Sequence, residues 1–451
     1  MEREHRQTSM VTEVVKALST YQSAFRELKQ TKPSVAWVEL MRESAMDRFE
    51  SLGIPTVADE EWKYTNLATL AKEDFQLATQ PSDLKRADVE RFGFPETAGS
   101  QLVVVNGQFR EDLSQREKLD GVVAIDLFTA VADARFSKLA RNYLARNANY
   151  HDKAMTALNT AFLQSGVFVL IPKNVKVEAP IHLTFIADPS VPKSASFPRV
   201  LVVAEENSSA HLIESFIANE EGEYFTNAVI EIVVEDGARL EHSRLQQESH
   251  QAFHIATSSV ELGRASSYNS TAINLGARLA RHDISVVMDH EGAECWVDGL
   301  YVVGENQHSD THSVIDHKQP FCNSRQLYKG ILDGNGRAVF NGKVFVREGA
   351  QKTDALQTNK NLLLSPQARV DTKPQLEIYA DDVKCAHGAA VGQLDQDQLF
   401  YLETRGINPE LGKNLLTYGF AEEVIEKIGV ASIRAELDNA VLKQLHANLE
   451  E

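Results

Sequence analysis

The stretch Asp236-Gly237-Ala238-Arg239-Leu240 combines a turn, a small residue and the start of an apolar segment, and it recurs along the chain. Related stretches carry the other aligned alanines, which are Ala210, Ala265 and Ala293. Consecutive alanines of this set are 28, 27 and 28 residues apart. A near-constant period with a small residue after a turn is typical of stacked coils, each of which covers the apolar edge of its neighbour.

The segments around this repeat have the composition of short β-strands. They are rich in Val, Ile, Leu and Phe and are separated by Gly, Asn, Asp and Pro. The first are Val167–Ile171, Ile181–Ile186, Val200–Ala204, Leu212–Ile217 and Val229–Val234, and no segment of helical length follows until about residue 394. Such a region is a sandwich, a barrel, a propeller or a solenoid. The repeat favours a β-helix or flattened β-solenoid, so we expect a mainly β protein with its core over residues 161–390.

Helical patterns flank this core on both sides. Residues 1–160 are expected to form a mainly helical domain, with one helix over Val35–Leu52 and another marked by apolar residues at helical spacing: Val11, Val14, Val15, Leu18, Tyr21, Phe25 and Leu28. Residues 391–451 are expected to form a helical C-terminal domain. One of its helices starts at Asn408-Pro409, where Asn can cap the helix and Pro suits the first position.

Composition excludes several classes of function. The chain has 451 residues and a net charge of -18 without a dense Lys/Arg run, which argues against nucleic-acid binding. Its apolar runs are short, so we expect no membrane span. The first residues are amphipathic rather than continuously apolar, which predicts a cytoplasmic protein. The only cysteines are Cys295, Cys322 and Cys385, without CxxC spacing, so a self-contained zinc or cluster site is not expected.

The motifs of common enzymes are missing from the sequence. A phosphate-binding loop needs four residues between its glycines and then Lys-Ser or Lys-Thr. Gly336 to Gly342, and Gly406 to Gly412, each enclose five residues, and the lysine that follows is not succeeded by a hydroxyl residue. GxSxG and HExxH motifs are also absent. We therefore expect a non-catalytic or weakly catalytic protein that depends on a partner for any ATP hydrolysis.

The stretch Leu376-Glu377-Ile378-Tyr379-Ala380-Asp381-Asp382-Val383-Lys384-Cys385-Ala386-His387-Gly388 carries the first candidate site. Interpreted as a single strand, it places residues 377, 379, 381, 383, 385 and 387 on one face. Cys385 and His387 are then neighbours with Cα atoms about 6.5 Å apart. A thiolate and an imidazole suit iron, copper or zinc. The alternative is a buried small cysteine beside a hydrogen-bonding histidine at a strand end.

The same stretch, together with Leu399-Phe400-Tyr401-Leu402-Glu403-Thr404-Arg405-Gly406-Ile407, resembles the SufB/SufD family of iron-sulfur cluster assembly proteins. Further similar runs are Trp62-Lys63-Tyr64-Thr65, whose plain interpretation is a packed Trp anchor in a loop, and Ser324–Leu332, for which we expect a structural or coupling role. The resemblance is closer to SufD, because SufB has a cysteine after the Phe-Tyr pair, where this chain has Leu402. It covers about residues 55–430.

The resemblance implies a fold, partners and ligands. It implies a right-handed parallel β-helix between helical ends, a heterodimer with SufB through the β-helix, and docking of the SufC ATPase on the C-terminal helices. It also implies that His387 is a ligand of iron or of a transient iron-sulfur cluster shared with SufB, with Cys385 as an auxiliary ligand or sulfur relay. A reduced flavin would supply electrons to the complex, and the chain would support iron acquisition. Whether it forms a homodimer alone is left open.

A second set of possible ligands lies between residues 282 and 322. His308, Asp310 and His312 alternate and would share a strand face, the geometry of a metal clip. A solvated or hydrogen-bonded face is the commoner outcome. The remaining members of the set are His282, Asp283, His290, Glu294, Cys295, His317 and Cys322.

Two other functions are compatible with a β-solenoid. One is a protein-interaction solenoid that binds no metal. The other is a β-helix enzyme that cleaves acidic polysaccharide, which is disfavoured because such enzymes are usually exported and this chain lacks a signal pattern.

Overall fold

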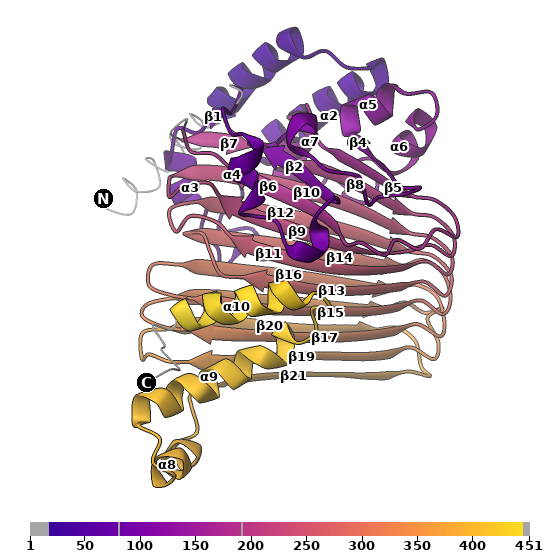
Figure 1. Cartoon of the computed structure of the whole chain (residues 1–451). Coiled ribbons are helices and arrows are strands. Elements are labelled where there is room, and N and C mark those ends of the chain that lie inside the picture. Colours follow the sequence, from indigo (N-terminus) through magenta and orange to yellow (C-terminus); the bar gives the residue numbers. More distant parts are fainter. Residues whose placement is uncertain (1–17, 80–81, 191–192, 445–451) are drawn as a thin grey trace.

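The computed structural model describes residues 18–79, 82–190 and 193–444, and its centre is a pair of stacked sheets (Figure 1). From β5 onward the chain passes back and forth between the two sheets, and successive strands of each sheet pair in parallel. The result is a parallel β-solenoid of about seven turns. The predicted mainly β fold, with a solenoid between helical ends, is confirmed.

From β8 onward, sheet A contains the even-numbered strands of the solenoid, and β5 precedes them. Its order places β20 at one edge and β4 at the other, and β1 and β7 pair beside it. The strands are β1 (Gln76–Leu77), β4 (Val123–Asp126), β5 (Val167–Ile171), β7 (Ser194–Ser196), β8 (Arg199–Ala204), β10 (Tyr224–Val234), β12 (Phe253–Leu262), β14 (Leu279–Met288), β16 (His308–His317), β18 (Arg337–Val346) and β20 (Arg369–Ile378).

Sheet B contains the odd-numbered strands from β9 onward together with β6, β2 and β3, and runs from β21 at one edge to β3 at the other. The strands are β2 (Gln101–Val105), β3 (Gln108–Phe109), β6 (Ile181–Ala187), β9 (Ser209–Ala218), β11 (Arg239–Gln247), β13 (Ser267–Asn274), β15 (Glu294–Val303), β17 (Asn323–Leu332), β19 (Asp354–Leu363) and β21 (Lys384–Gly392). The five strands that the sequence predicts first correspond to β5, β6, β8, β9 and β10.

The structure corrects the alignment of the repeat. Arg239 N donates to Ser208 O, Ser267 N donates to Ala238 O, and Glu294 N donates to Ser266 O. The residues that stack at the turn are therefore Ser208, Ala238, Ser266, Ala293 and Cys322. Ala210 lies two residues further along, in β9 opposite Leu240 of β11, and Ala265 lies one residue early. The period is correct, but serine and cysteine fill the same small space as alanine, and this hides the exact phase.

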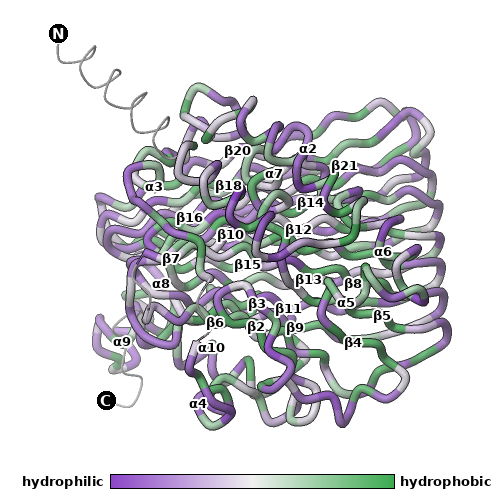
Figure 2. Tube along the Cα trace, turned by 90° about the horizontal axis from the view of Figure 1, so that it is seen from above, coloured by the Kyte–Doolittle hydropathy of each residue, from purple (hydrophilic) through white to green (hydrophobic). Residues whose placement is uncertain are grey.

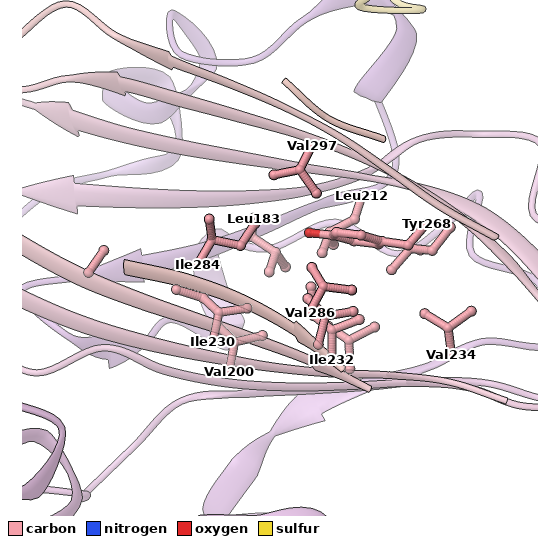
Figure 3. Packing of buried hydrophobic residues seen from close by; sticks show 14 of the residues in the cluster. Leu183, Val200, Leu212, Ile230, Ile232, Val234, Tyr268, Ile284, Val286 and Val297 are labelled. Atoms are coloured by element: carbon pink, nitrogen blue, oxygen red, sulfur yellow. The ribbon is translucent and has the colours of Figure 1, made fainter. Parts of the chain in front are cut away.

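The main core lies between the two sheets. Alternate residues of each strand point inward, and Figure 3 shows Ile230 and Ile232 of β10 on the side of the core opposite Leu212 of β9 and Tyr268 of β13. Parallel strands covered on both faces are apolar along their length, as β5 is throughout and β8 is after Arg199, because helices also cover their outer side. Later strands alternate more clearly, and hydrophobic and hydrophilic stretches follow one another along the trace in Figure 2.

Helices of the N-terminal region cover one end and part of sheet A (Figure 1). A helix over residues 18–31 packs Tyr21, Phe25 and Leu28 into the core, and the second predicted helix is α2 (Ala36–Leu52). Val11, Val14 and Val15 lie outside the described residues. The remaining helices are α3 (Ala68–Lys72), α4 (Arg86–Glu90), α5 (Leu127–Ala132), α6 (Ser137–Tyr143) and α7 (Ala154–Ala161). The boundary at residue 160 stays a prediction, as does the one at 390.

Three helices follow the last strand. They are α8 (Gln396–Thr404), α9 (Pro409–Ile425) and α10 (Ala431–Gln444). Asn408 Oδ1 accepts a hydrogen bond from Leu411 N, which confirms the predicted start of α9. The helices α9 and α10 lie against the outer face of sheet B across several turns, with Val424 and Ile433 packed near Leu300. Within the described part of the chain, no helix is both long and apolar enough to cross a membrane.

Candidate functional site

The solenoid has one end where its last strands have no further partner. β20 and β21 are the terminal strands of their sheets, so the backbone groups along their outer sides are unpaired by any strand of the described chain. Ile378 is 41% exposed and Val391 is 48% exposed at this end, although the corresponding residues one turn earlier, Val346 and Asn361, are buried. An unpaired edge with exposed apolar side chains is a surface that another β-structure can extend.

Cys385 and His387 lie on this open end, in β21. In the register of the strands, Cys385 stands beside Ala355 and His387 stands beside Gln357 of β19. Ala355 and Gln357 are buried between the sheets, so Cys385 and His387 share the inward face, as expected. Because no further turn covers them, His387 is exposed and Cys385 is partly buried. Burial raises the pKa of the Cys385 thiol, so the thiol is protonated at neutral pH.

The prediction that residues 376–388 form one strand is wrong. β20 ends at Ile378 in sheet A, and β21 starts at Lys384 in sheet B. Between them the chain turns, and Lys352 N donates to Asp382 O to hold the turn on the previous coil. Glu377 therefore lies in the other sheet from Cys385. The turn residues Ala380-Asp381-Asp382 contain no Gly or Pro, which is why the turn is hard to find in the sequence.

The other two cysteines are distant from this end. Cys295 stands in the same column as Cys385, but Ser324 and Ala355 lie between them. Three spacings of about 4.8 Å between neighbouring strands place the Cα atoms of Cys295 and Cys385 roughly 14 Å apart. Burial raises the pKa of both Cys295 and Cys322, and the thiol of Cys322 donates to His290 O. All three cysteines are free thiols.

His308, Asp310 and His312 share the outer face of β16, as predicted, but they are bound to protein groups rather than arranged for a metal. Asp310 Oδ2 accepts from Arg281 Nη1 at 3.0 Å and from Thr65 Oγ1 at 2.5 Å. Thr65 Oγ1 also lies 2.8 Å from His308 Nε2. The two ring nitrogens of His312 face carboxylates, Nε2 at 3.1 Å from Asp310 and Nδ1 at 3.3 Å from Glu61.

Charge explains why this cluster does not suit a cation. Burial would lower the pKa of His312, but Asp310 and Glu61 raise it to about 9. A protonated imidazole has no lone pair for a metal. Burial would raise the pKa of Asp310, but His312 and Arg281 hold it well below its usual range. In residues 18–79, 82–190 and 193–444 no group of three or more His, Cys, Asp or Glu side chains is arranged to hold a metal.

The other residues of the 282–322 set do not converge. His282 lies inside the solenoid beside Ser258, and His317 lies beside Ser324. Asp283 pairs with Arg281, and Glu294 accepts from Asn323. The Trp62-Lys63-Tyr64-Thr65 run contacts Arg281 and Asp310, and the sequence does not reveal these contacts. Trp62 stacks on Arg281 with 3.7 Å from the guanidinium carbon to the ring centre, so the expected Trp anchor is confirmed.

Sequence reasoning missed a polar network inside the solenoid. Arg244 Nη2 lies 2.5 Å from His254 Nε2, and His254 Nδ1 lies 2.6 Å from Glu248. His242 Nε2 lies 3.3 Å from Glu214. All five side chains are at least 95% buried. Burial lowers the pKa of His254, so a neutral ring can accept from Arg244 and donate to Glu248. The alternation of polar residues along β11 was the available signal in the sequence. It was obscured because the neighbouring strands are apolar.

The C-terminal helices present two different surfaces. The helices α9 and α10 are tied to sheet B, where Lys427 pairs with Asp298 at 2.7 Å. α8 has no buried residue, and its Phe400 and Tyr401 are 67% and 56% exposed. Figure 1 shows α8 projecting beyond the last strands. Large exposed aromatic side chains on a projecting helix are characteristic of a protein-binding surface.

Comparison with known proteins defines the class. Residues 185–420 match the family model "SUF system FeS cluster assembly, SufBD core domain", and residues 15–183 match the SufBD N-terminal region. The chain therefore belongs to the SufBD family, which confirms the resemblance found in the sequence. The matched core covers the solenoid from the end of β6 onward, including Cys385 and His387, and also the exposed helix α8.

Relatives with the name SufD are among the matches. The chain is 32% identical to the iron-sulfur cluster assembly protein SufD of Escherichia coli over 381 residues, which are 83% of this chain and 86% of the relative. It is 27% identical to SufD of Bacillus subtilis over 445 residues, 95% and 98% of the two chains. A SufBD family iron-sulfur cluster assembly protein of Synechocystis is 38% identical over 408 residues, 89% of each chain.

Proposed function

We propose that this chain is the SufD-type scaffold subunit of an iron-sulfur cluster assembly complex, and that it pairs with SufB through the open end of its solenoid. The observation that carries the proposal is the position of Cys385 and His387 on the terminal strand β21. Both residues lie on the inward face of the last coil, which a further coil would cover. A partner solenoid docked on β20 and β21 would supply that coil and enclose both ligands.

Iron and sulfide are the cargo of this proposed site. Cys385 and His387 offer one sulfur and one nitrogen, whereas clusters are usually held by four ligands. The ligands that complete the shell would come from SufB. His387 binds iron or a transient cluster, and Cys385 is an auxiliary ligand or sulfur relay that becomes a thiolate on binding the metal. In this role the chain also supports iron acquisition.

The C-terminal helices are the proposed docking surface for the SufC ATPase. The exposed aromatic residues of α8 support this role, and α9 and α10 provide a rigid base on sheet B. The chain itself is non-catalytic in this proposal, and SufC hydrolyses ATP. We place the complex in the cytoplasm. A reduced flavin as electron source belongs to the same proposal, but no residue of this chain is assigned to it.

The test is the iron and acid-labile sulfide content of the complex with SufB and SufC after anaerobic reconstitution. We expect His387→Ala to leave the complex intact and to lower both contents sharply. His151→Ala is the matched control, because His151 is also exposed but lies far from β21 in the N-terminal region. Its metal content should equal that of the unmodified chain.

Two results would contradict the proposal. Unchanged iron and sulfide in an intact His387→Ala complex would show that His387 is not a ligand of the iron in the complex. That result would favour the alternative in which this chain is an interaction solenoid that binds no metal. Failure of the unmodified chain to co-purify with SufB would reject the pairing.

A further inference from the structure

A cavity of about 500 Å³ lies outside the solenoid, between sheet A and the loop that leads to Trp62. Its floor is formed by outward-facing residues of β14, β16 and β18, including Ser285, Val314 and Phe345. Its roof includes Pro55 from the loop and Met155 from α7. A concave site of this volume suits a small organic molecule, for which pockets of about 300–1,000 Å³ are usual.

The roof of this cavity is fixed in place. Trp62 stacks on Arg281, whose Nη1 donates to Glu61 O at 2.7 Å. Glu61 in turn accepts a hydrogen bond from Lys343 Nζ at 2.6 Å. These contacts join residues more than 200 positions apart in the chain. The cavity is therefore formed before any ligand arrives, which reduces the entropic cost of binding.

Two buried polar atoms of the cavity lining have no hydrogen-bond partner in the described chain, the hydroxyl of Ser313 and the amide oxygen of Asn341. Asn341 lines the floor, is 6% exposed, and its amide oxygen accepts no hydrogen bond from the described chain. A buried acceptor without a donor is costly, and a ligand that donates to it removes that cost. The surrounding floor and roof are mainly apolar. The amide oxygen of Asn341 therefore favours a ligand with an N–H or O–H donor, and the Ser313 hydroxyl can either donate or accept.

The charged groups on the cavity floor and the Glu61 beside it are paired with one another, whereas Asp152 and Lys153 lie exposed at the rim. Arg281 contacts Asp283 and Asp310, His312 contacts Asp310 and Glu61, and Lys343 contacts Glu61. Three cations therefore face three carboxylates. A charged group placed on the floor beside Asn341 would lose its hydration without gaining a free counter-charge there.

We propose that this cavity binds an uncharged small molecule with an apolar body and one N–H or O–H donor, which donates to the amide oxygen of Asn341. This site is separate from the open end with Cys385 and His387, and it does not depend on the proposed assembly function. Its occupant would fasten the N-terminal loop to the solenoid.

The test uses N-phenyl-1-naphthylamine, an uncharged fluorescent molecule with two aromatic groups and one N–H. We expect saturable binding to the full chain with one site per chain. Two related molecules test the chemistry on the unmodified protein. 1-Phenylnaphthalene lacks the donor and should bind about two- to twelvefold more weakly, the value of one neutral hydrogen bond. 8-Anilinonaphthalene-1-sulfonate adds a negative charge and should bind at least about tenfold more weakly.

Variants locate the binding site. Asn341→Leu should weaken N-phenyl-1-naphthylamine by the same two- to twelvefold, on the order of one hydrogen bond, and leave 1-phenylnaphthalene unweakened. Ser285→Trp should fill the cavity and abolish saturable binding of both molecules. Val391→Asp, at the exposed solenoid end, is the control and should bind as the unmodified chain does. Thermal melting confirms that each variant is folded.

Several results would overturn the proposal. They are no saturable binding to the unmodified chain, equal binding of the donor-free molecule, tighter binding of the sulfonate, or unchanged binding to folded Ser285→Trp. Loss of binding in Val391→Asp would place the dye at the solenoid end and would equally reject the cavity as its site. The three-molecule comparison needs no variant, so it holds even where a substitution prevents folding.

Discussion

At the scale of single residues, His312 shows how surroundings change the chemistry of a side chain. In the sequence, His312 alternates with His308 and Asp310, and this spacing is typical of metal ligands on one face of a strand. In the folded chain its nitrogens face Asp310 and Glu61, and the neighbouring cations are Arg281 and Lys343. The ring is thereby held as a cation in an ion-pair network. A histidine of this kind stabilises the fold instead of binding metal.

This charge state predicts a pH dependence of stability. The pKa of His312 is raised to about 9, above its ordinary value of about 6.5. A raised pKa contributes stability that is complete below pH 6.5 and is lost as the pH rises through 9. We expect the free energy of unfolding to fall over this range by up to about 3 kcal/mol. Urea unfolding between pH 6 and 9.5 measures it.

The control for this prediction is His312→Gln. Glutamine keeps hydrogen-bonding groups but does not titrate, so the variant should lose most of the slope between pH 6.5 and 9. His308 does not confuse the comparison, because burial lowers its pKa. Identical slopes for the two proteins would show that His312 is not protonated in the folded state.

At the scale of elements, the C-terminal helices differ in what holds them. α9 and α10 bury an apolar face against sheet B. α8 buries none of its residues, and its aromatic side chains face solvent. Helix propensity alone stabilises a short exposed helix poorly, so an apolar surface of this kind is expected to be covered by a partner.

Phe400→Asp tests α8 as the docking surface. We expect the variant to keep the melting temperature of the unmodified chain, because Phe400 is 67% exposed, and to lose binding to SufC. Leu40→Asp is a matched control, since Leu40 is also 67% exposed but lies in α2. Calorimetric titration with SufC measures both. Binding that is unchanged in Phe400→Asp would exclude this face of α8.

At the scale of the whole molecule, the solenoid is protected at one end and open at the other. Helices and short strands of the N-terminal region cover the first coils, whereas β20 and β21 end their sheets. Lys384 N donates to Thr353 O, so the backbone of Lys384 points toward the preceding coil. By the alternation along a strand, the N–H of Ala389 points to the free edge and that of Ala390 points to β19.

Proline substitutions can therefore separate folding from partner binding. Ala389→Pro removes an N–H at the free edge, where proline is tolerated, so the chain should fold but lose pairing with SufB. Ala390→Pro removes an N–H that serves the fold and should lower the melting temperature. Co-purification and thermal melting check the pair. Normal SufB binding by folded Ala389→Pro would mean that the edge of β21 is not the interface.

The sequence by itself determined the class of fold, the helical ends and the family. Turn residues, small residues and apolar alternation are local signals, and they repeat often enough to identify a solenoid even when the phase of Ala210 and Ala265 is misjudged. Cys385 and His387 were placed on one face because only one residue separates them in a strand.

Only the tertiary structure decided where those faces point and what surrounds them. It showed that the chain turns between Ile378 and Lys384, so the candidate ligands lie on the last coil and are uncovered. It also showed that Thr65 contacts Asp310, 245 positions away. His308, Asp310 and His312, which resemble metal ligands in the sequence, are therefore part of a network of hydrogen bonds and ion pairs. Such contacts depend on how a distant loop docks, and local periodicity contains no information about docking.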